Sequence, residues 1–294
     1  MLAKRRLDKI SDQNRWLREL CGFEEQALAM VRPVDLATME PEIIECRKGD
    51  ANVMFNYWRA VLSSEPQGKS YSWYGRSASF LVRDRVSGGF LGVFAISDPP
   101  NTLKPMLRHF KWDENEEARL ARQHQALMLR RCLPIYEFGQ MTGGKLLALA
   151  ATSQEVLRLF ELRYSFQFVY FLIRTLHGKS SQYNRLQQRG IELIEVDAEN
   201  KGFYGMELRK KALAYMREGT PYGKTAMHKL GDQVDYWKDR WLNARVQSTG
   251  NPSLITPDPE RYRLSNQLDS KRMTPAAIEA AELEKKNGDD GAVE

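Results

Sequence analysis

The stretch that decides the fold runs from Arg131 to Leu149, RCLPIYEFGQMTGGKLLAL. Its apolar beginning predicts a strand, Gly143-Gly144 predicts a turn, and the apolar spacing that follows predicts a helix opening on Lys145. A strand, a glycine turn and a helix in this order present free backbone N–H groups and the positive end of a helix dipole to an anion. The stretch therefore predicts a site for a phosphorylated ligand.

One interpretation of this turn is a nucleotide-binding P-loop, because Gly139 and Gly144-Lys145 match the spacing G-x-x-x-x-G-K. Leu146, however, stands where a Ser or Thr hydroxyl should hold Mg²⁺. The strand predicted next, 168–175 (FVYFLIRT), ends without the carboxylate that a metal-dependent phosphoryl transfer needs. A nucleoside-triphosphatase therefore ranks low.

The same residues also resemble the Q/R-x-x-G-x-G/A turn of the GNAT acetyltransferase superfamily, in which backbone amides cradle the pyrophosphate of coenzyme A. Lys145 replaces the small residue expected at the last position, although an ammonium beside a pyrophosphate is favourable. The resemblance implies acetyl-CoA or a related acyl-CoA as the cofactor. Its expected ligands in this stretch are Gln140, Thr142, Gly143, Gly144 and Lys145. A turn that binds nothing is the open alternative.

Composition limits the classes of protein that remain. The 294 residues can bury one good core, and the formal net charge of +6 is a mild bias towards polyanions. Three scattered cysteines argue against a disulfide framework, and no zinc spacing is present. The N-terminus carries no secretory signal and no apolar run is long enough to span a membrane. We therefore expect a cytoplasmic protein without membrane contact.

The apolar patterns predict an alternation of helices and strands. Residues 4–30 fit a helical arm broken at Gly22, and 53–62 a helix. Residues 78–85 and 90–96, joined by VSGG, predict a hairpin. Residues 168–175 and 191–196 predict further strands, and the other helices are expected at 102–130, 145–162, 180–188, 208–217 and 232–244. Everything beyond Thr249 is polar and interrupted by proline, which is typical of a mobile tail.

This order of elements is that of the GNAT fold. We therefore predict the α+β class, with a GNAT-like mixed sheet flanked by helices, an N-terminal helical arm and a mobile C-terminal tail. The expected units are the arm at 1–50, the GNAT-like domain at 51–245 and the tail at 246–294.

Three segments carry a closer resemblance: GRSASFLVRDRVSGGFLGVFAI from Gly75, LPIYEFGQMTGGKLLALAATS from Leu133, and HGKSSQYNRL from His177. Together they resemble the Druantia A family, which is found in anti-phage defence loci and in phages and other mobile elements. The resemblance implies nucleic acid, with DNA favoured, and other phage or defence-system proteins as partners. It supplies no reaction.

The segment from His177 to Arg185 is the second expected site, because titratable and amide side chains follow directly after a buried strand. In a GNAT-like layout it lies at the mouth of the cleft beside the coenzyme thioester. Tyr183 would then return a proton to the leaving thiolate, His177 would act as the base, and Ser180 or Asn184 would orient the coenzyme or the substrate. In the alternative, Ser180 caps a helix and Tyr183 packs in the core.

Basic residues mixed with aromatic ones suit nucleic acid, since cations neutralise phosphates and rings stack on bases. The expected nucleic-acid contacts are Arg76, Lys179, Arg185, Lys210 and Lys211. Trp237 and Trp241, four residues apart, are expected to be buried instead. His109, His124 and His228 lack metal-ligand spacing, so no metal site is expected.

The sequence thus favours an acyl-CoA-dependent transferase that acts on nucleic acid or on an associated target. The alternative is a non-catalytic DNA-binding component of a phage or anti-phage defence system.

Overall fold

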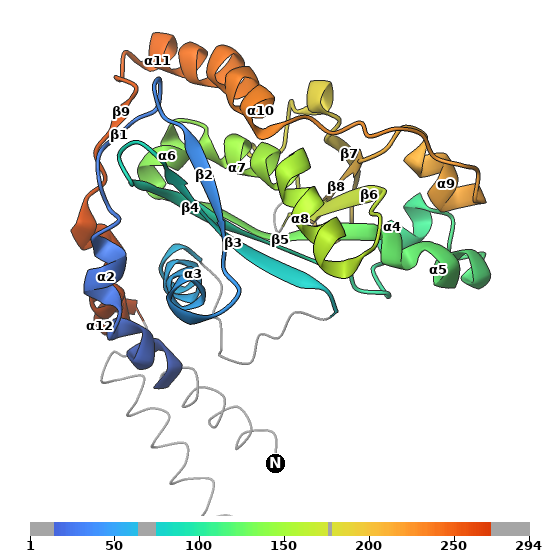
Figure 1. The fold of residues 1–294 in the computed structure, drawn as a ribbon, viewed down its shortest axis with the longest axis horizontal. Helices are drawn as coiled ribbons and strands as arrows, with labels where there is room; N and C mark the ends of the chain where they lie inside the picture. The colour runs from blue at the N-terminus through green and yellow to red at the C-terminus, as the bar shows by residue number, and fades with distance from the viewer. Residues whose placement is uncertain (1–14, 64–74, 176–177, 272–294) are drawn as a thin grey trace, which may run out of the picture.

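The computed structural model describes residues 15–63, 75–175 and 178–271. Its centre is a seven-stranded mixed sheet in the order β2-β3-β4-β5-β6-β8-β7, with helices on both faces (Figure 1). The strands are β2 (Pro41–Glu45), β3 (Ser77–Asp84), β4 (Phe90–Ser97), β5 (Ala126–Pro134), β6 (Tyr170–Arg174), β7 (Glu192–Val196) and β8 (Gly202–Glu207). The predicted α+β class, with a mixed sheet flanked by helices, is confirmed.

The helices that flank the sheet are α2 (Glu24–Leu28), α3 (Gly49–Leu62), α4 (Lys104–His109), α5 (Glu116–Arg122), α6 (Tyr136–Gln140), α7 (Gly143–Ala151), α8 (Gln154–Tyr164), α9 (Ala212–Glu218), α10 (Leu230–Trp237), α11 (Asn243–Thr249) and α12 (Leu264–Lys271). A π-helical segment, η3 (Lys238–Leu242), joins α10 to α11, and 3-10 turns lie at η1 (Gln123–Gln125), η2 (Gln187–Arg189) and η4 (Pro259–Tyr262).

The sheet contains one parallel pair, β5 and β6, among antiparallel neighbours. A parallel pair requires a crossover, and α6, α7 and α8 supply it. Because the crossover returns the chain to the start of β6, the end of β5 and the beginning of α7 lie together at one end of the pair. This arrangement positions the candidate site.

The hairpin predicted at 78–85 and 90–96 is confirmed as β3 and β4. Its turn is fixed locally, because the Asp84 carboxylate accepts hydrogen bonds from the backbone N–H and the hydroxyl of Ser87. Gly88 adopts φ +71°, a conformation that glycine tolerates without strain. Every residue of β4 is buried, as expected for a strand covered on both faces.

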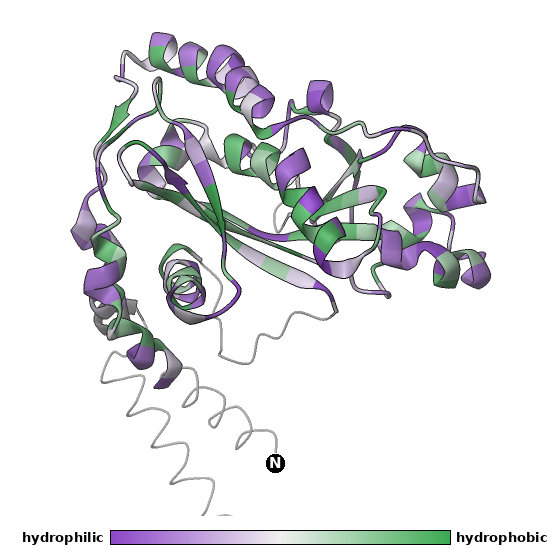
Figure 2. Ribbon diagram, in the orientation of Figure 1, coloured by the Kyte–Doolittle hydropathy of each residue, from purple (hydrophilic) through white to green (hydrophobic). Residues whose placement is uncertain are grey.

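Two helices pack against the centre of the sheet from opposite faces (Figure 1). From α3, Trp58 stacks on Phe90 with ring centroids 4.0 Å apart. From α7, Leu147 lies in the core with no exposed area, and burial of one such leucine contributes about 1.5–3 kcal/mol. Figure 2 shows α7 and the central strands as hydrophobic and the α10–α11 helix as largely hydrophilic.

Three helix predictions, and one segment without a prediction, differ from the structure. Residues 126–130 lie in β5, not in a helix. The helix expected at 145–162 is two helices, α7 and α8, because the Thr152 hydroxyl donates to the carbonyls of Ala148 and Leu149 and ends α7. Residues 180–186 form turns rather than a helix, and 202–207, which were assigned no element, form β8.

Both expected boundaries of the domain fall inside structured chain. Strand β2 precedes residue 50 and is the first strand of the sheet. Beyond Thr249, the short strand β9 (Leu254–Ile255) pairs with β1 (Val34–Asp35). The Tyr262 side chain is buried, and its carbonyl accepts a hydrogen bond from the Tyr57 hydroxyl at 2.8 Å. The chain between 250 and 267 therefore packs on the domain, and the rest of the expected tail, from 272 to 294, lies outside the described residues.

In the described part of the chain, no helix has the length and apolar character needed to cross a bilayer.

Candidate functional site

A cleft opens where β5 and β6 separate. The two strands pair over four residues and diverge after Leu129 and Ile173. At this point β5 carries one extra residue, Arg130, in its pairing with β4. Such a bulge bends its strand and is common beside functional sites. The resulting pocket has a volume of about 320 Å³ and lies at the carboxyl ends of the parallel pair, where open sheets of this type bind ligands.

The cleft receives residues from the end of α3, from β5 and β6, and from the turn that follows β6. Its described lining consists of Leu62, Ser63, Met128, Leu129, Arg130, Arg131, Cys132, Leu133, Arg174, Thr175, Ser180, Gln182 and Tyr183. Of these residues, the sequence predicts only Ser180 and Tyr183.

The Tyr183 hydroxyl lies beside the Cys132 thiol within the lining of the cleft. Burial raises the pKa of Tyr183 well above its usual value, and the neighbouring Cys132 adds to the increase. Burial also raises the pKa of Cys132 to about 12. Gln182 Nε2 donates to the Cys132 carbonyl at 3.1 Å and to its sulfur at 2.8 Å. Both acidic groups therefore keep their protons at neutral pH.

The turn that carries Tyr183 is held by a tyrosine of β8. The Tyr204 hydroxyl accepts a hydrogen bond from the Ser180 N–H at 3.1 Å and donates to Asn184 Oδ1 at 2.8 Å. Asn184 thus directs its amide towards Tyr204, whereas Ser180 remains in the lining of the cleft. His177, the expected base, lies outside the described residues.

The predicted glycine turn forms the N-terminus of α7, which begins at Gly143, two residues earlier than expected. Thr142 precedes it in the left-handed conformation, with φ +64°. A Cβ on Gly143 would lie 2.3 Å from the Phe138 ring, and one on Gly144 would lie 3.0 Å from the Gln182 side chain. Packing against Phe138 therefore requires glycine at 143 whether or not a ligand binds, and a side chain at 144 would require Gln182 to shift.

Lys145 does not point its ammonium out of this turn. Its Nζ donates to the carbonyls of Ser181 at 2.5 Å and Asn184 at 2.6 Å, and lies 4.4 Å from the centre of the Trp241 ring. Burial lowers the pKa of Lys145 to about 8, and the charge of Arg185 adds to the decrease. Lys145 thus ties α7 to the turn that carries Tyr183.

Helices α10 and α11 cover the glycine turn. Trp237 Nε1 donates to the carbonyl and hydroxyl oxygens of Thr142 at 3.1 and 3.2 Å, and Arg245 Nε donates to the Gln140 carbonyl at 3.0 Å. The π-helical segment between α10 and α11 contains Trp241, which covers Lys145. Burial of Trp237 is confirmed, and Trp241 is half-buried. In this arrangement side chains fill the space in front of the turn.

The residues expected to contact nucleic acid lie in different environments. Arg76 is bound to Asp98, with Nη2 and Oδ1 2.9 Å apart, and lies over the Phe168 ring. Lys179 and Arg185 are exposed on the segment beside the cleft, and Lys210 and Lys211 are exposed after β8. The structure therefore does not bring the five residues together on one surface.

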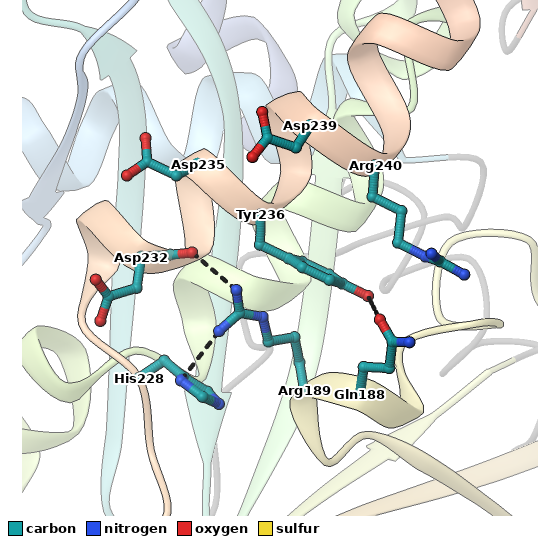
Figure 3. Close-up of a pocket in the computed structure, with 8 residues that line it drawn as sticks. All are labelled: Gln188, Arg189, His228, Asp232, Asp235, Tyr236, Asp239 and Arg240. Atoms are coloured by element: carbon teal, nitrogen blue, oxygen red, sulfur yellow. Dashed lines mark hydrogen bonds between the residues drawn. The ribbon is translucent and has the colours of Figure 1, made fainter.

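A larger open pocket, of about 800 Å³, lies elsewhere, between η2 and α10 (Figure 3). Arg189 donates to His228 Nδ1 at 3.0 Å and to the Asp232 carbonyl at 3.1 Å, and its guanidinium lies over the Tyr236 ring. These contacts join the turn η2 to α10 and give Arg189 a structural role. Within the described residues, no group of three or more His, Cys, Asp and Glu is arranged to hold a metal ion.

Three arginines that line the cleft, Arg130, Arg131 and Arg174, are absent from the site residues that the sequence predicts. A signal was present, because basic residues follow apolar runs at LMLRR and FLIR. A charge directly after a buried strand lies at the edge of the sheet, where ligands bind. The end of β5 was not recognised as a strand end, because residues 126–130 were predicted to be helical.

The fold and cleft define an α+β protein with a single parallel strand pair that opens into an arginine-lined pocket. A family model described as Druantia protein DruA matches residues 1–232, and the chain belongs to this family. Membership associates it with anti-phage defence. Neither the curated proteins nor the solved structures gave a match.

Proposed function

We propose that the protein is an acyl-CoA-dependent transferase with a GNAT-like core, which acts in anti-phage defence on nucleic acid or on an associated target. The observation that carries this proposal is the separation of β5 from β6 beyond the Arg130 bulge, with Tyr183 in the lining of the resulting cleft. Other defence-system proteins are its expected partners.

The cleft fits the slender thioester arm of such a coenzyme. Leu129 and Leu133 supply apolar lining, and Ser180 and Gln182 supply polar groups. Beyond Leu129, β5 runs on to Pro134 without a described partner strand on its β6 side. The Gln182 amide binds the Cys132 carbonyl there, and an amide-bearing ligand would take the place of this contact. The phosphates fit the α7 turn only after the covering side chains move, with Gly143 and Gly144 supplying backbone N–H groups.

Acyl-CoA would supply an acyl group activated as a thioester. Tyr183 would donate its hydroxyl proton to the sulfur as the carbon–sulfur bond breaks and the acceptor bonds to the acyl carbon. The proton of the acceptor would pass to His177, as the sequence predicts. Cys132 stays a neutral thiol beside Tyr183, because its pKa is raised to about 12.

The test is thiol release from acetyl-CoA in the presence of DNA, measured for the wild type, Tyr183→Phe and Tyr136→Phe. Removal of a catalytic acid lowers kcat by roughly a hundredfold or more, and we expect this for Tyr183→Phe with KM unchanged. Tyr136 is exposed and outside the cleft, so Tyr136→Phe should match the wild type. Equal rates in all three proteins would refute the role of Tyr183.

The second candidate function is non-catalytic DNA binding, which a cluster of exposed lysines favours. Lys210 and Lys211 lie beside Lys224, since the Lys210 N–H donates to the Lys224 carbonyl at 3.0 Å. Tyr222 lies in the same loop and packs on Tyr215 with ring centroids 4.9 Å apart. Three cations beside an aromatic ring suit a phosphate backbone.

Salt dependence of duplex DNA binding tests this candidate. The double variant Lys210→Ala/Lys211→Ala should lower the slope of log K against log salt concentration by roughly 1.8, about 0.9 for each phosphate contact. Lys48→Ala/Lys104→Ala removes the same charge from exposed positions elsewhere and should leave the slope unchanged. Identical slopes in both variants would exclude the lysine cluster from the interface.

A further inference from the structure

A second cavity lies at the opposite end of β6 from the cleft. Its volume is about 590 Å³, which is within the usual range for small-molecule sites. Tyr170, the first residue of β6, lines this cavity, whereas Arg174 at the end of the same strand lines the cleft. The described linings of the two have no residue in common. A ligand in this cavity would therefore leave the proposed coenzyme site free.

A phenol and two carboxylates lie on one face of the sheet in this cavity. Tyr170 is paired with Glu207 across β6 and β8, and Glu192 is paired with Gly205 across β7 and β8. Directly paired residues share a face of the sheet, as do residues two apart on one strand. A Cβ on Gly205 would lie 2.6 Å from the Tyr170 hydroxyl oxygen. The glycine therefore lets this hydroxyl lie over β8, in the row that contains both carboxylates.

The Tyr170 hydroxyl keeps an oxygen lone pair for a ligand. The residue is only 4% exposed, and its oxygen lies 2.8 Å from His109 Nε2. Burial lowers the pKa of His109 to about 4, and the charge of Arg217 adds to the decrease, so the imidazole is neutral. Burial raises the pKa of Tyr170, and the charges of Glu207 and Glu192 add to the increase. The phenol therefore keeps its proton, which has its described acceptor in Nε2, and the phenolic oxygen is left to accept.

The cations of the described chain do not neutralise the two carboxylates. Glu207 Oε2 accepts a hydrogen bond from the Ala212 N–H at 2.8 Å, and neither Glu207 nor Glu192 forms an ion pair with a described residue. Arg189, which also lines the cavity, donates to residues of α10 and the loop before it (Figure 3). Arg217 donates to the backbone carbonyl at 109. The cavity thus offers three acceptors, two of which are negatively charged.

An alkylammonium ion matches this arrangement. Its three N–H donors equal the three acceptors in number, and the acceptors come from three strands rather than from one plane. An alkyl chain would lie against the apolar lining that Ile194, Met206 and Leu213 supply. An anionic ligand would instead meet two like charges, which repel it.

A neighbouring pocket favours a ligand with more than one ammonium group. The cavity of Tyr170 adjoins the pocket of Figure 3, because residues of η2 and His228 line both. Further carboxylates line that pocket, from Asp232, Asp235 and Asp239. A second ammonium group on the same alkyl chain would reach them.

We infer that the cavity beside Tyr170 binds an alkylammonium ion, and that its ligand is a linear polyamine with a second ammonium group beside α10. The inference goes beyond the proposed transferase and does not rest on it, since the cavity and the cleft are lined by different residues.

The test is calorimetric titration of the full chain with spermidine, in the absence of acetyl-CoA. We expect saturable binding at one site per chain. Glu192→Gln removes one charged acceptor and should weaken binding severalfold, the effect of losing one exposed ion pair. Glu117→Gln removes the same charge from an exposed position on α5, and this matched control should bind as the wild type does. Absence of binding to the wild type, or an equal loss in both variants, overturns the inference.

Tyr170→Phe tests the third acceptor, because it keeps the ring and removes the oxygen. Its affinity for spermidine should fall severalfold while its circular dichroism spectrum matches that of the wild type. A folded Tyr170→Phe protein with unchanged affinity would refute the arrangement of three acceptors.

Two capped tripeptides separate the sources of the cation. A lysine tripeptide should bind more weakly than spermidine, because it carries a single ammonium group, and tighter binding of this peptide would overturn the polyamine in favour of a partner's lysine. An arginine tripeptide should bind no better than the lysine one, and a preference for arginine would overturn the ammonium assignment. Spermidine binding that depends on Glu192, in a protein that binds no acetyl-CoA, would support this site and refute the transferase.

Discussion

Lys145 holds Asn184: its ammonium donates to the Asn184 carbonyl at 2.6 Å, and a second hydrogen bond reaches Ser181. These two bonds bracket Tyr183, which lies between the two carbonyls in the sequence. Helix α7 of the crossover and the turn after β6 are thereby joined. The position of the tyrosine hydroxyl in the cleft consequently depends on a buried lysine of the glycine turn.

Stability should depend on the protonation of Lys145. The folded-state pKa is lowered to about 8 from the ordinary value of 10.5, so between these values the unfolded chain binds more protons than the folded one. The free energy of unfolding contributed by this group therefore rises with pH from about 8 to 10.5. Denaturant titrations at pH 7 and pH 10 should show the wild type gaining stability relative to Lys145→Met. If the free energy of unfolding of the wild type, minus that of Lys145→Met, stays constant or falls between pH 7 and pH 10, burial does not lower the pKa of Lys145.

Gly143 and Gly139 should respond oppositely to alanine. A Cβ at Gly143 would lie 2.3 Å from the Phe138 ring, while one at Gly139 would lie 3.5 Å from the Pro134 ring. Gly143→Ala should lower the free energy of unfolding by about 1–3 kcal/mol through overpacking. Gly139→Ala, in α6, should be neutral or stabilise by up to about 1 kcal/mol. Chemical denaturation measures the free energy of unfolding of both variants. Equal values for Gly143→Ala and Gly139→Ala would disprove the close packing at the start of α7.

Removing the cover from the glycine turn should strengthen coenzyme binding. Trp241 lies over Lys145, so Trp241→Ala opens the space in front of α7, and the affinity for acetyl-CoA should rise severalfold. Tyr236→Ala shortens an aromatic side chain on the same helix that lines the pocket of Figure 3 instead, and should leave the affinity unchanged. If calorimetry gives the same affinity for Trp241→Ala as for the wild type, the turn does not bind the phosphates.

The segment after Thr249 should contribute to stability. Tyr262 is buried, and its hydroxyl accepts a hydrogen bond from the Tyr136 N–H at 2.9 Å and donates to the Glu137 carboxylate. Tyr262→Ala should cost about 3–5 kcal/mol, as other large-to-small changes of buried aromatic residues do. Tyr136→Ala, at an exposed ring, should cost much less. Thermal or chemical unfolding measures both variants. Equal losses of the free energy of unfolding in Tyr262→Ala and Tyr136→Ala would contradict the packing of this segment.

The parts of the fold that could be predicted from sequence are those with local signals. The β3–β4 hairpin was found because two apolar runs flank VSGG, and the glycine turn because its residues are adjacent. Residues 126–130 were misassigned because a short apolar run after a charged helix has no distinguishing period. The division between α7 and α8 depends on hydroxyl bonds of Thr152, which periodicity does not reveal.

The candidate site was only partly predictable, because its geometry depends on distant residues. The sequence placed Tyr183 and Ser180 beside the cleft. It assigned Lys145 to a pyrophosphate, whereas the ammonium contacts carbonyls at 181 and 184. It also gave no indication that Trp237 and Arg245 would contact Thr142 and Gln140, since those contacts join segments about a hundred residues apart in the sequence. Such tertiary pairs leave no local pattern.

The most direct test of the central claim is calorimetric titration of the wild type and Trp241→Ala with acetyl-CoA, followed by hydrogen exchange of the complex. We predict saturable binding at one site per chain and slower exchange of backbone amides at 131–133 and 180–184, on the two sides of the cleft. Absence of binding in both proteins, or protection confined to other segments, would contradict the assignment of the cleft to an acyl-CoA.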